Sequence, residues 1–321
     1  MGGSLFINSK NVVALHNLNV MSSVSKQLSG ILTAYEYNIL KVIDSVFKNS
    51  SSLTAGGMYF DYLNQIFIFN STFESIQATY TGGLFKISWE NKIKISQSNI
   101  TYINNQGDGN VFYLSNGNYL FVNLTRFNDC YFLADFLYAW KMNFILFFLN
   151  TIDSSPENIP NNYDIYFSGK DNSIKIHKTI IKKPNFKYLI YSSENANISI
   201  YDMRISEVVF FSSLVYCDIY CNLIVSNFSH KNKIEFSTYF NLRKSMFSIK
   251  NSTFKARYNT LGYISNSKVL ISNSKFIHQV RNPYFSLETF LSFSVYLKKM
   301  FLFTQDFYST FQKYLLHNRI F

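Results

Sequence analysis

Proline and glycine are scarce in this chain, which has 4 Pro and 12 Gly among 321 residues. Their scarcity excludes a collagen-like repeat and a proline-rich linker. Charged residues are also few, at 15%, whereas 47% of the residues are hydrophobic and 33 are Phe. So much apolar side chain can offset the entropy cost of ordering, which excludes an intrinsically disordered chain. The sequence therefore predicts a folded protein with a large core.

Cysteine is scarcer still, with only Cys130, Cys217 and Cys221. The odd count excludes a disulfide framework, and no CxxC or Cys/His spacing indicates a zinc site. Cys217 and Cys221 could pair or remain free, and we favour free cysteines that act as small, buried or half-buried apolar side chains. Cysteine usage therefore does not reveal the compartment.

Acidic residues are outnumbered, with 19 Asp and Glu against 30 Lys and Arg, which gives a net charge of +11. Such a balance is compatible with an anionic partner, either nucleic acid or a membrane surface. The positive charges are spread along the chain, however, and the longest runs noted are the pairs Lys182–Lys183 and Lys298–Lys299. We therefore do not expect nucleic-acid binding.

Long uninterrupted apolar runs are missing as well. The two best candidates for a membrane span are residues 131–149, which contain Asp135 and Lys141, and residues 290–303, which are short and split by a lysine pair. The first residues form neither a secretory signal nor a myristoylation pattern, because position six is Phe6. We expect membrane association only through segments that are not evident in this chain.

An internal repeat is what the sequence does contain. Segments that begin at Gly56, Gly82, Gly109, Ser213 and Thr260 follow one template. Each has a short apolar run, a polar turn, and then an alternating strand that ends in a polar residue, usually an amide. Such self-similarity at a fixed period is typical of solenoid folds.

The second strand of the template aligns without gaps on its terminal polar residue. This terminal column consists of Asn17, Asp44, Asn70, Gln97, Asn123, Asn150, Lys178, Asp202, Asn227, Asn251 and Asn273. Two positions earlier stand Leu15, Val42, Ile68, Ile95, Phe121, Phe148, Ile176, Ile200, Val225, Ile249 and Ile271. Four positions earlier stand Val13, Leu40, Ile66, Ile93, Tyr119, Leu146, Ile174, Ile198, Leu223, Phe247 and Val269. Because all 22 are apolar or aromatic, the alternation predicts a strand with one buried face.

A rung of about 26 residues cannot bury its own apolar face, so it needs neighbours above and below. Stacked rungs at about 4.8 Å pair each strand in parallel with its equivalents and align the apolar positions inside a coil. The alternation also places the terminal column inward, as a buried amide ladder at a turn. We expect Asn70, Asn123, Asn227 and Asn251 to be buried there.

At this point the sequence resembles the right-handed parallel β-helix, the pectin-lyase-like fold. The paired glycines at Gly56–Gly57 and Gly82–Gly83, with the strand ends at Phe73 and Phe254, look like the repeats of polymorphic outer-membrane-type surface proteins of bacteria and protists. The expected fold is all-β, a parallel β-helix of about eleven rungs. The repeat domain is expected to cover residues 1–283, with a C-terminal cap or non-repeat tail over 284–321. A leucine-rich repeat is the rival solenoid, but it requires a Leu pattern and helices that this chain lacks.

The sequence contains few arrangements of residues that catalysis or metal binding would require. The acidic residues are scattered, and Asp44 and Asp202 are best interpreted as turn residues. The histidines show no metal-ligand spacing, and alternation points His16 and His177 outward. No phosphate-binding loop is present. We therefore expect no catalytic residue, no cofactor site and no metal site.

Seven glycosylation sequons occur, at Asn49, Asn70, Asn99, Asn123, Asn197, Asn227 and Asn251. Four of them belong to the terminal column, which the alternation buries. If the protein is secreted, Asn49, Asn99 and Asn197 are the expected acceptors.

The expected function is that of a non-catalytic structural or adhesive repeat protein of the cell surface, extracellular or membrane-associated. We expect the chain to be a fragment of a larger extracellular or membrane-anchored protein, with carbohydrate or another surface protein as partner. The alternative is a carbohydrate-active enzyme, a polysaccharide lyase or glycoside hydrolase, because the resembled fold hosts both kinds of protein.

Overall fold

The computed structural model describes residues 3, 5–132, 135–141, 143–153, 163–182, 185–206, 210–230, 238–256, 260–265, 267–278, 295–298 and 301–302. Strands are the regular secondary structure of this described part, and they form three long parallel sheets and one short sheet. Within the same residues there is no helix with the length and hydrophobicity that a membrane crossing requires.

Each long sheet takes one strand from successive rungs. The first sheet has eleven strands: β1 (Leu5–Ile7), β4 (Leu32–Tyr35), β8 (Met58–Asp61), β11 (Phe85–Ser88), β14 (Phe112–Ser115), β18 (Leu137–Trp140), β21 (Tyr163–Ser168), β24 (Asn185–Ser192), β27 (Phe210–Cys217), β30 (Thr238–Arg243) and β33 (Thr260–Ser265). The second has twelve: β2 (Val12–His16), β5 (Ile39–Ile43), β9 (Gln65–Phe69), β12 (Lys92–Ser96), β15 (Tyr119–Asn123), β19 (Phe144–Phe148), β22 (Asn172–His177), β25 (Ala196–Tyr201), β28 (Asn222–Ser226), β31 (Met246–Lys250), β34 (Lys268–Ser272) and β36 (Val295–Lys298).

The third side of the coil is less regular. Its sheet runs through β3 (Asn19–Met21), β6 (Val46–Lys48), β10 (Thr72–Ala78), β13 (Asn99–Asn105), β16 (Arg126–Asn128), β20 (Thr151–Asp153), β23 (Ile180–Lys182), β26 (Arg204–Ser206) and β29 (Ser229–His230), with β7 (Ser51–Ser52) and β17 (Tyr131–Phe132) beside it. A short sheet of β32 (Thr253–Ala256), β35 (Lys275–His278) and β37 (Phe301–Leu302) follows.

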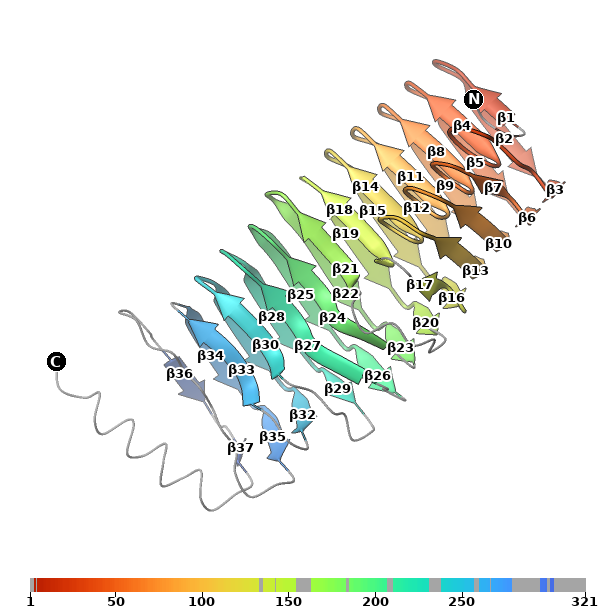
Figure 1. Ribbon diagram of the computed structural model, residues 1–321. Coiled ribbons are helices and arrows are strands. Elements are labelled where there is room, and N and C mark those ends of the chain that lie inside the picture. The colour runs from red at the N-terminus through yellow and green to blue at the C-terminus, as the bar shows by residue number, and fades with distance from the viewer. Residues whose placement is uncertain are drawn as a thin grey trace.

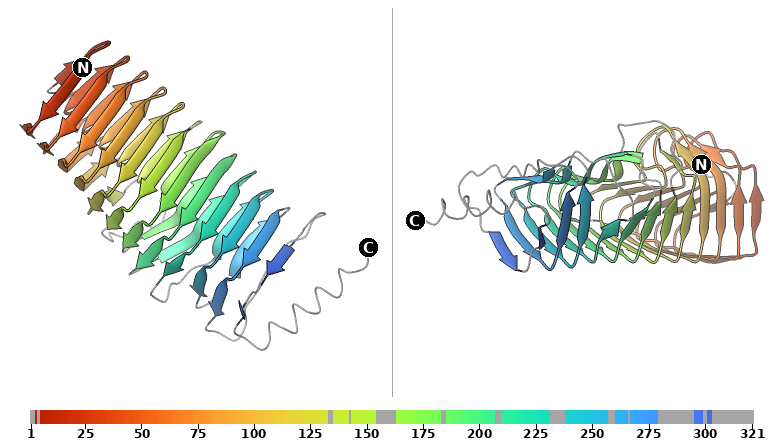
Figure 2. Two further views of the ribbon diagram at one scale, coloured as in Figure 1. Left: turned by 180° about the vertical axis from the view of Figure 1, so that it is seen from behind. Right: turned by 90° about the horizontal axis from the view of Figure 1, so that it is seen from below.

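The strands stack into an elongated rod, with the N-terminus at one end and the later strands at the other (Figures 1 and 2). Neighbouring strands within each sheet pair in parallel, as β9 does with β12 through Ile66↔Ile93 and Ile68↔Ile95. These four isoleucines are almost completely buried because successive side chains of a strand point to opposite faces. The predicted fold class is confirmed: the chain is an all-β parallel solenoid.

Two strands lie in the segment predicted to be a cap or tail. β36 pairs in parallel with β34, and β37 pairs with β35, so both add to the stack. The remainder of 284–321 lies outside the described residues, and the domain boundary at 283 stays a prediction.

The predicted inward columns are correct in most rungs but wrong in β15 and β19. Ile95 stacks on Val122, not on Phe121, and Val122 stacks on Phe147. In these two strands Leu120, Val122, Ile145 and Phe147 are buried. The outward side chains are Tyr119, Phe121, Phe144, Leu146 and Phe148. The error arose because both strands are apolar on both faces, so alternation alone could not fix their register.

The terminal column does not point inward, except at Asn150. Asn17, Asn70, Asn227 and Asn251 are exposed, and Asn123 is half-buried, so the predicted burial of the amide ladder is wrong. The chain instead turns at residues with positive φ, between 46° and 54°, in which Leu124 and Leu149 take the places predicted for Asn123 and Asn150: Asn17, Asp44, Asn70, Gln97, Leu124, Leu149, Lys178, Asp202, Asn227, Asn251 and Asn273. Each strand of the second sheet from β2 to β34 thus ends in a left-handed residue that turns the chain, and Asn accepts that conformation more readily than most residues.

A buried asparagine ladder does exist, at the opposite end of the second sheet. It comprises Asn38, Asn64, Asn91, Asn118, Asn143 and Asn172. The backbone N–H of each of the first five donates to the side-chain Oδ1 of the next Asn along the rod; the Asn64 N to Asn91 Oδ1 distance is 2.9 Å. Each Nδ2 group donates to a carbonyl three residues earlier, as Asn118 does to Ser115. The ladder therefore satisfies buried polar groups in six consecutive rungs.

The residue after each left-handed turn is the one that is buried. In several rungs it is a hydroxyl residue, such as Ser45, Ser71, Ser98 and Thr125, and in one it is Asn150. The Ser45 N–H donates to Ser71 Oγ at 3.3 Å, and the Thr125 N–H donates to Asn150 Oδ1 at 2.9 Å. This corner is thus held by a second ladder, made mostly of hydroxyl groups.

Candidate functional surfaces

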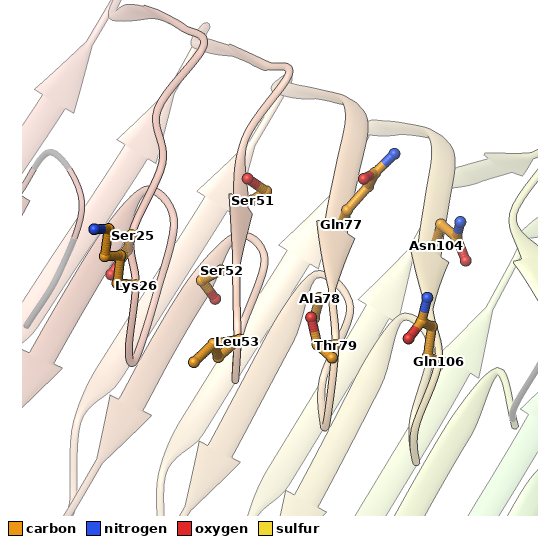
Figure 3. A pocket seen from close by; sticks show the side chains of 10 residues that line it. All are labelled: Ser25, Lys26, Ser51, Ser52, Leu53, Gln77, Ala78, Thr79, Asn104 and Gln106. Carbon is orange, nitrogen blue, oxygen red and sulfur yellow. The ribbon is translucent and has the colours of Figure 1, made fainter.

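A shallow polar groove of about 600 Å³ lies on the third side of the rod, over the first four rungs. Its lining consists of Ser25, Lys26, Ser51, Ser52, Leu53, Gln77, Ala78, Thr79, Asn104 and Gln106. In Figure 3, Ser51, Gln77 and Asn104 lie in a row across neighbouring strands, and the register pairs Gln77 with both of the others. The groove thus presents hydroxyl and amide groups at the spacing of stacked strands, about 4.8 Å.

Strand β13 carries acceptors that have no hydrogen-bond partner within the chain. The Asn99 Oδ1, Thr101 Oγ1 and Asn104 Oδ1 atoms are all buried and unsatisfied. Buried acceptors without partners are rare in proteins and indicate a place that water or a ligand occupies. Asn104 is the one that lines the groove.

The groove forms where the third side bends. Asn49, Ser75 and Tyr102 have positive φ and lie between the two halves of this side in successive rungs. The bend places β7 and the ends of β10 and β13 at an angle to their preceding residues, and it moves Gln77 and Asn104 to the outer surface. These residues were not predicted as a site, because hydroxyl and amide side chains in a turn-rich segment give no motif.

A column of tyrosines runs along the outside of the first sheet. It comprises Tyr113, Tyr138, Tyr166, Tyr191 and Tyr216. Successive ring centroids are 5.0 to 5.2 Å apart and the rings are nearly parallel. Desolvation raises the pKa of four of them, Tyr113, Tyr138, Tyr166 and Tyr216, so these hydroxyls stay protonated. The ring faces are used in stacking, and only the ring edges and hydroxyls remain available.

The same sheet carries a small group of titratable residues toward the N-terminal end of the tyrosine column. Burial raises the pKa of Asp61, and burial lowers the pKa of Lys86. Desolvation, followed by the nearby Asp61, also raises the pKa of Tyr59. The Lys86 Nζ atom lies 5.6 Å from the Tyr59 ring centroid and 5.7 Å from that of Tyr113. Perturbed groups of this kind occur at catalytic sites and also in structural pairs.

The candidate turn residues and histidines lie as follows. Asp44 and Asp202 are left-handed turn residues, as predicted. His16 is exposed, and the half-buried His177 points outward, with its Nε2 atom 2.9 Å from Asp202 Oδ2. The side chains of His230 and His278 and all of His317 lie outside the described part. Among the residues that the structure describes, no group of three or more His, Cys, Asp and Glu could hold a metal ion.

The sequons fall mostly on exposed turns. The side chains of Asn49, Asn70, Asn197, Asn227 and Asn251 are exposed, and those of Asn99 and Asn123 are half-buried. The expectation that the terminal column would be unavailable for glycan attachment is therefore wrong for Asn70, Asn227 and Asn251. Their side chains face solvent because the strand ends one residue before the chain turns inward.

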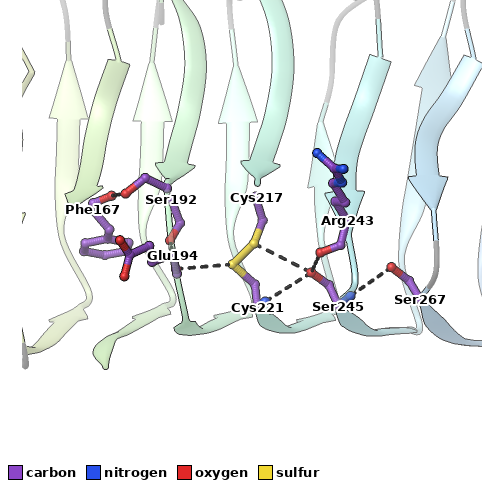
Figure 4. The surroundings of a disulfide bond; sticks show 9 residues. Phe167, Ser192, Glu194, Cys217, Cys221, Arg243, Ser245 and Ser267 are labelled. Atoms are coloured by element: carbon purple, nitrogen blue, oxygen red, sulfur yellow. Dashed lines mark hydrogen bonds between the residues drawn. A yellow bond between two sulfur atoms is a disulfide. The ribbon is translucent and has the colours of Figure 1, made fainter. Parts of the chain in front are cut away.

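The cysteines differ from the favoured interpretation in one respect. Cys217 and Cys221 form a disulfide with their Cα atoms 6.2 Å apart, and both residues are buried (Figure 4). Cys221 occupies the asparagine-ladder position, where its N–H donates to Ser245 Oγ at 3.1 Å. Cys130 is free and buried, as predicted, and burial raises the pKa of its thiol to about 12.

Fold and surfaces together define a parallel β-solenoid with a polar groove, a tyrosine column and a disulfide. Comparison of the chain with protein-family models, curated proteins and solved structures gives no match.

Proposed function

We propose that this chain is a non-catalytic structural or adhesive repeat module of a surface protein, with the polar groove as its adhesive site. The pectin-lyase-like and outer-membrane-type resemblances of its repeats belong to the same proposal. The observation that carries it is the row of hydroxyl and amide groups that Ser51, Gln77 and Asn104 present from successive rungs. The ligand class that fits is a neutral polysaccharide, because its hydroxyl groups both donate to and accept from such side chains.

The lining of the groove supports an uncharged ligand. Its hydroxyl and amide groups, among them Gln77, can both donate to and accept from sugar hydroxyls. Lys26 is the one charged residue of the lining. A largely uncharged lining suits a neutral polymer better than an acidic one.

The disulfide supports an extracellular location for the proposed module. Disulfides persist in oxidising environments such as the cell exterior and are rare in the cytosol. Cys217 and Cys221 are joined, and five sequon asparagines are exposed, which is compatible with a secreted and glycosylated protein.

Binding to a panel of immobilised neutral polysaccharides tests the adhesive role. We expect the wild-type chain to bind at least one of them and the double variant Gln77→Ala/Asn104→Ala to lose at least tenfold in affinity. Gln65→Ala is the matched control, because Gln65 is an exposed amide on the outer face of the second sheet. Absence of binding across the panel, or equal binding by the double variant and wild type, would contradict the proposal.

A carbohydrate-active enzyme is the second candidate, and the group of Asp61, Lys86 and Tyr59 is the observation that favours it. A carboxyl with a raised pKa and an amine with a lowered pKa on one sheet face could exchange protons with a bound sugar. Release of unsaturated or reducing ends from acidic polysaccharides, abolished by Asp61→Asn, would establish this candidate in place of the non-catalytic one.

A further inference from the structure

The outer face of the second sheet carries lysines but no acidic residues at its strand positions. From β2 to β34, its outward strand positions contain six exposed lysines and no Asp or Glu. The lysines are Lys41, Lys92, Lys94, Lys175, Lys250 and Lys268. The outward faces of the other two sheets include Asp61 and Glu74, so this absence is specific to the strands of the second sheet.

The middle of this face is apolar. We define the central patch as Tyr119, Phe121, Leu124, Phe144, Leu146, Phe148 and Leu149. The Tyr119 and Phe144 rings stack with centroids 4.9 Å apart, and the Lys94 Nζ atom lies 5.6 Å from the Phe121 ring centroid. All seven side chains are half-buried or exposed, although the core beneath is already filled by Leu120, Val122, Ile145 and Phe147.

Two members of the central patch lie in an unfavourable backbone conformation. Leu124 and Leu149 have φ values of 49° and 54°, and their side chains are 46% and 40% exposed. In the other rungs from β2 to β34, the equivalent turn residue is Asn, Asp, Gln or Lys. A left-handed Leu bears the usual cost of crowding between its Cβ atom and the following carbonyl oxygen, and its exposure brings no packing energy in return. The fold therefore does not itself require an apolar side chain at these two exposed turn positions.

Exposed lysines border the central patch on both sides along the rod. Lys92 and Lys94 belong to β12, the neighbour of β15, and Lys175 belongs to β22, the neighbour of β19. Lys178 follows in the turn after β22 and is exposed. The turns that precede β12 and β22 add the exposed acids Glu90 and Asp171, so each margin holds more basic than acidic residues. The surface therefore has an apolar centre between two margins of net positive charge.

The apolar centre and its basic margins distinguish between three possible binding partners of this face. A second copy packed face to face on the central patch would bring lysines of one copy against lysines of the other. An acidic polysaccharide requires hydrogen-bonding groups, but six of the seven patch side chains have none. A bilayer that contains anionic lipid provides both an apolar layer and a negatively charged surface above it.

We infer that the outer face of the second sheet docks the rod, lengthwise, on the surface of a membrane that contains anionic lipid. The lysines lie among the negatively charged head groups, and the central patch enters the boundary between head groups and acyl chains. This inference is independent of the polar groove, which lies on another side of the rod.

Co-sedimentation with vesicles tests the inference. We expect wild type to bind phosphatidylcholine vesicles that contain 30% phosphatidylserine, to bind pure phosphatidylcholine at least tenfold more weakly, and to lose binding as salt is raised. Leu124→Asn/Leu149→Asn is expected to reduce binding at least tenfold while remaining folded, because Asn suits the left-handed turn. Ile180→Asn, at an exposed apolar position on the third sheet, is the matched control and should bind like wild type.

A second experiment compares two double variants that each remove two positive charges. Lys92→Gln/Lys94→Gln should weaken binding to the anionic vesicles, whereas Arg126→Gln/Arg204→Gln should have a smaller effect. Both double variants remove two positive charges, but Arg126 and Arg204 are exposed on the third sheet. Equal effects of the two pairs would mean nonspecific attraction by net charge and would overturn the inference.

Three other outcomes would also overturn it. They are equal binding to neutral and anionic vesicles, binding to polygalacturonate without binding to vesicles, and a dimer in light scattering that Leu124→Asn/Leu149→Asn dissolves while vesicle binding is absent. Gln77→Ala/Asn104→Ala should retain full vesicle binding, so failure of the adhesive groove and failure of membrane docking are distinguishable.

Discussion

The second sheet ends in asparagine at both of its corners, yet the two corners use this residue for different purposes. At the entry corner, where the chain enters each strand of the second sheet, the six asparagines of the buried ladder bond to neighbouring rungs. At the exit corner, where the chain leaves each strand, Asn70, Asn227 and Asn251 are exposed and left-handed. One corner therefore uses the hydrogen-bonding capacity of the amide, and the other uses the tolerance of Asn for positive φ.

The difference explains which residues other than Asn occur at each corner. The exit corner also holds Asp44, Gln97, Leu124 and Lys178, because any side chain can face solvent there if the backbone cost is met. The entry corner keeps Asn in seven consecutive rungs, of which the last six are buried, and then changes to Ala196, Cys221, Ser245 and Ser267. At the entry corner the side chain determines which residue fits, and at the exit corner the backbone conformation does.

The largest expected effect comes from replacing one residue of each corner by leucine. Asn91→Leu removes the acceptor of the Asn64 N–H and Nδ2 groups, both at 2.9 Å, and the donor to the Ser88 carbonyl. Each buried group left unpaired costs about 1 to 3 kcal/mol, so we expect at least about 3 kcal/mol lower free energy of unfolding. Asn70→Leu should cost about 1 kcal/mol, mainly from the left-handed backbone, because the hydrogen bond that its Nδ2 group donates to Asp44 Oδ1 at 2.6 Å is exposed to solvent. Urea unfolding followed by circular dichroism measures both, and equal losses would contradict the division between the corners.

The fold could be predicted from sequence because its apolar columns repeat in every rung, but the register could not be fixed in β15 and β19. A column six residues before the exit corner holds Asn11, Asn38, Asn64, Asn91, Asn118, Asn143 and Asn172. Alignment on this entry column places Leu124 and Leu149, not Asn123 and Asn150, at the exit corner. The sequence therefore contains the signal for the correct register, but the amides Asn123 and Asn150 match the terminal column equally well and favour the wrong one.

The candidate surfaces were harder to predict than the fold. The groove depends on the bend at Asn49, Ser75 and Tyr102, and positive φ at Ser and Tyr has no sequence signature. The central patch depends on which face of two wholly apolar strands points outward, which is the register that the sequence left open. Local composition thus predicted the presence of strands, whereas the content of each outer face required the three-dimensional stack.

A smaller effect is expected where the entry corner contains a disulfide in place of an amide. The Cys217–Cys221 bond joins residues four apart, and so short a loop contributes about 2 kcal/mol in the chain-entropy description. Reduction by a phosphine should therefore lower the urea midpoint of wild type. Cys217→Ala/Cys221→Ser should start at the lower midpoint and show no response to the reductant. A response that persists in this variant would assign the effect to another cause, and Cys130→Ala tests the free thiol.

The smallest effect is expected from the ion pair at the exit corner. The pKa of Asp202 is lowered, first by the hydrogen bond that Asn227 donates to it at 2.8 Å and then by His177. A carboxyl with a lowered pKa adds stability above its unfolded pKa, near 3.9, and loses that contribution as the pH falls through the lower folded value. Because the half-buried side chain of Asp202 is still reached by solvent, which screens the interaction, the contribution should stay below about 1 kcal/mol. Asp202→Asn keeps a residue that tolerates positive φ, so the difference between its urea midpoint and that of wild type at pH 6 and at pH 2.5 isolates the charge. We expect wild type to lose slightly more stability than the variant between these two values. A loss several times larger would mean that the exit corner, like the entry corner, depends on its side-chain contacts.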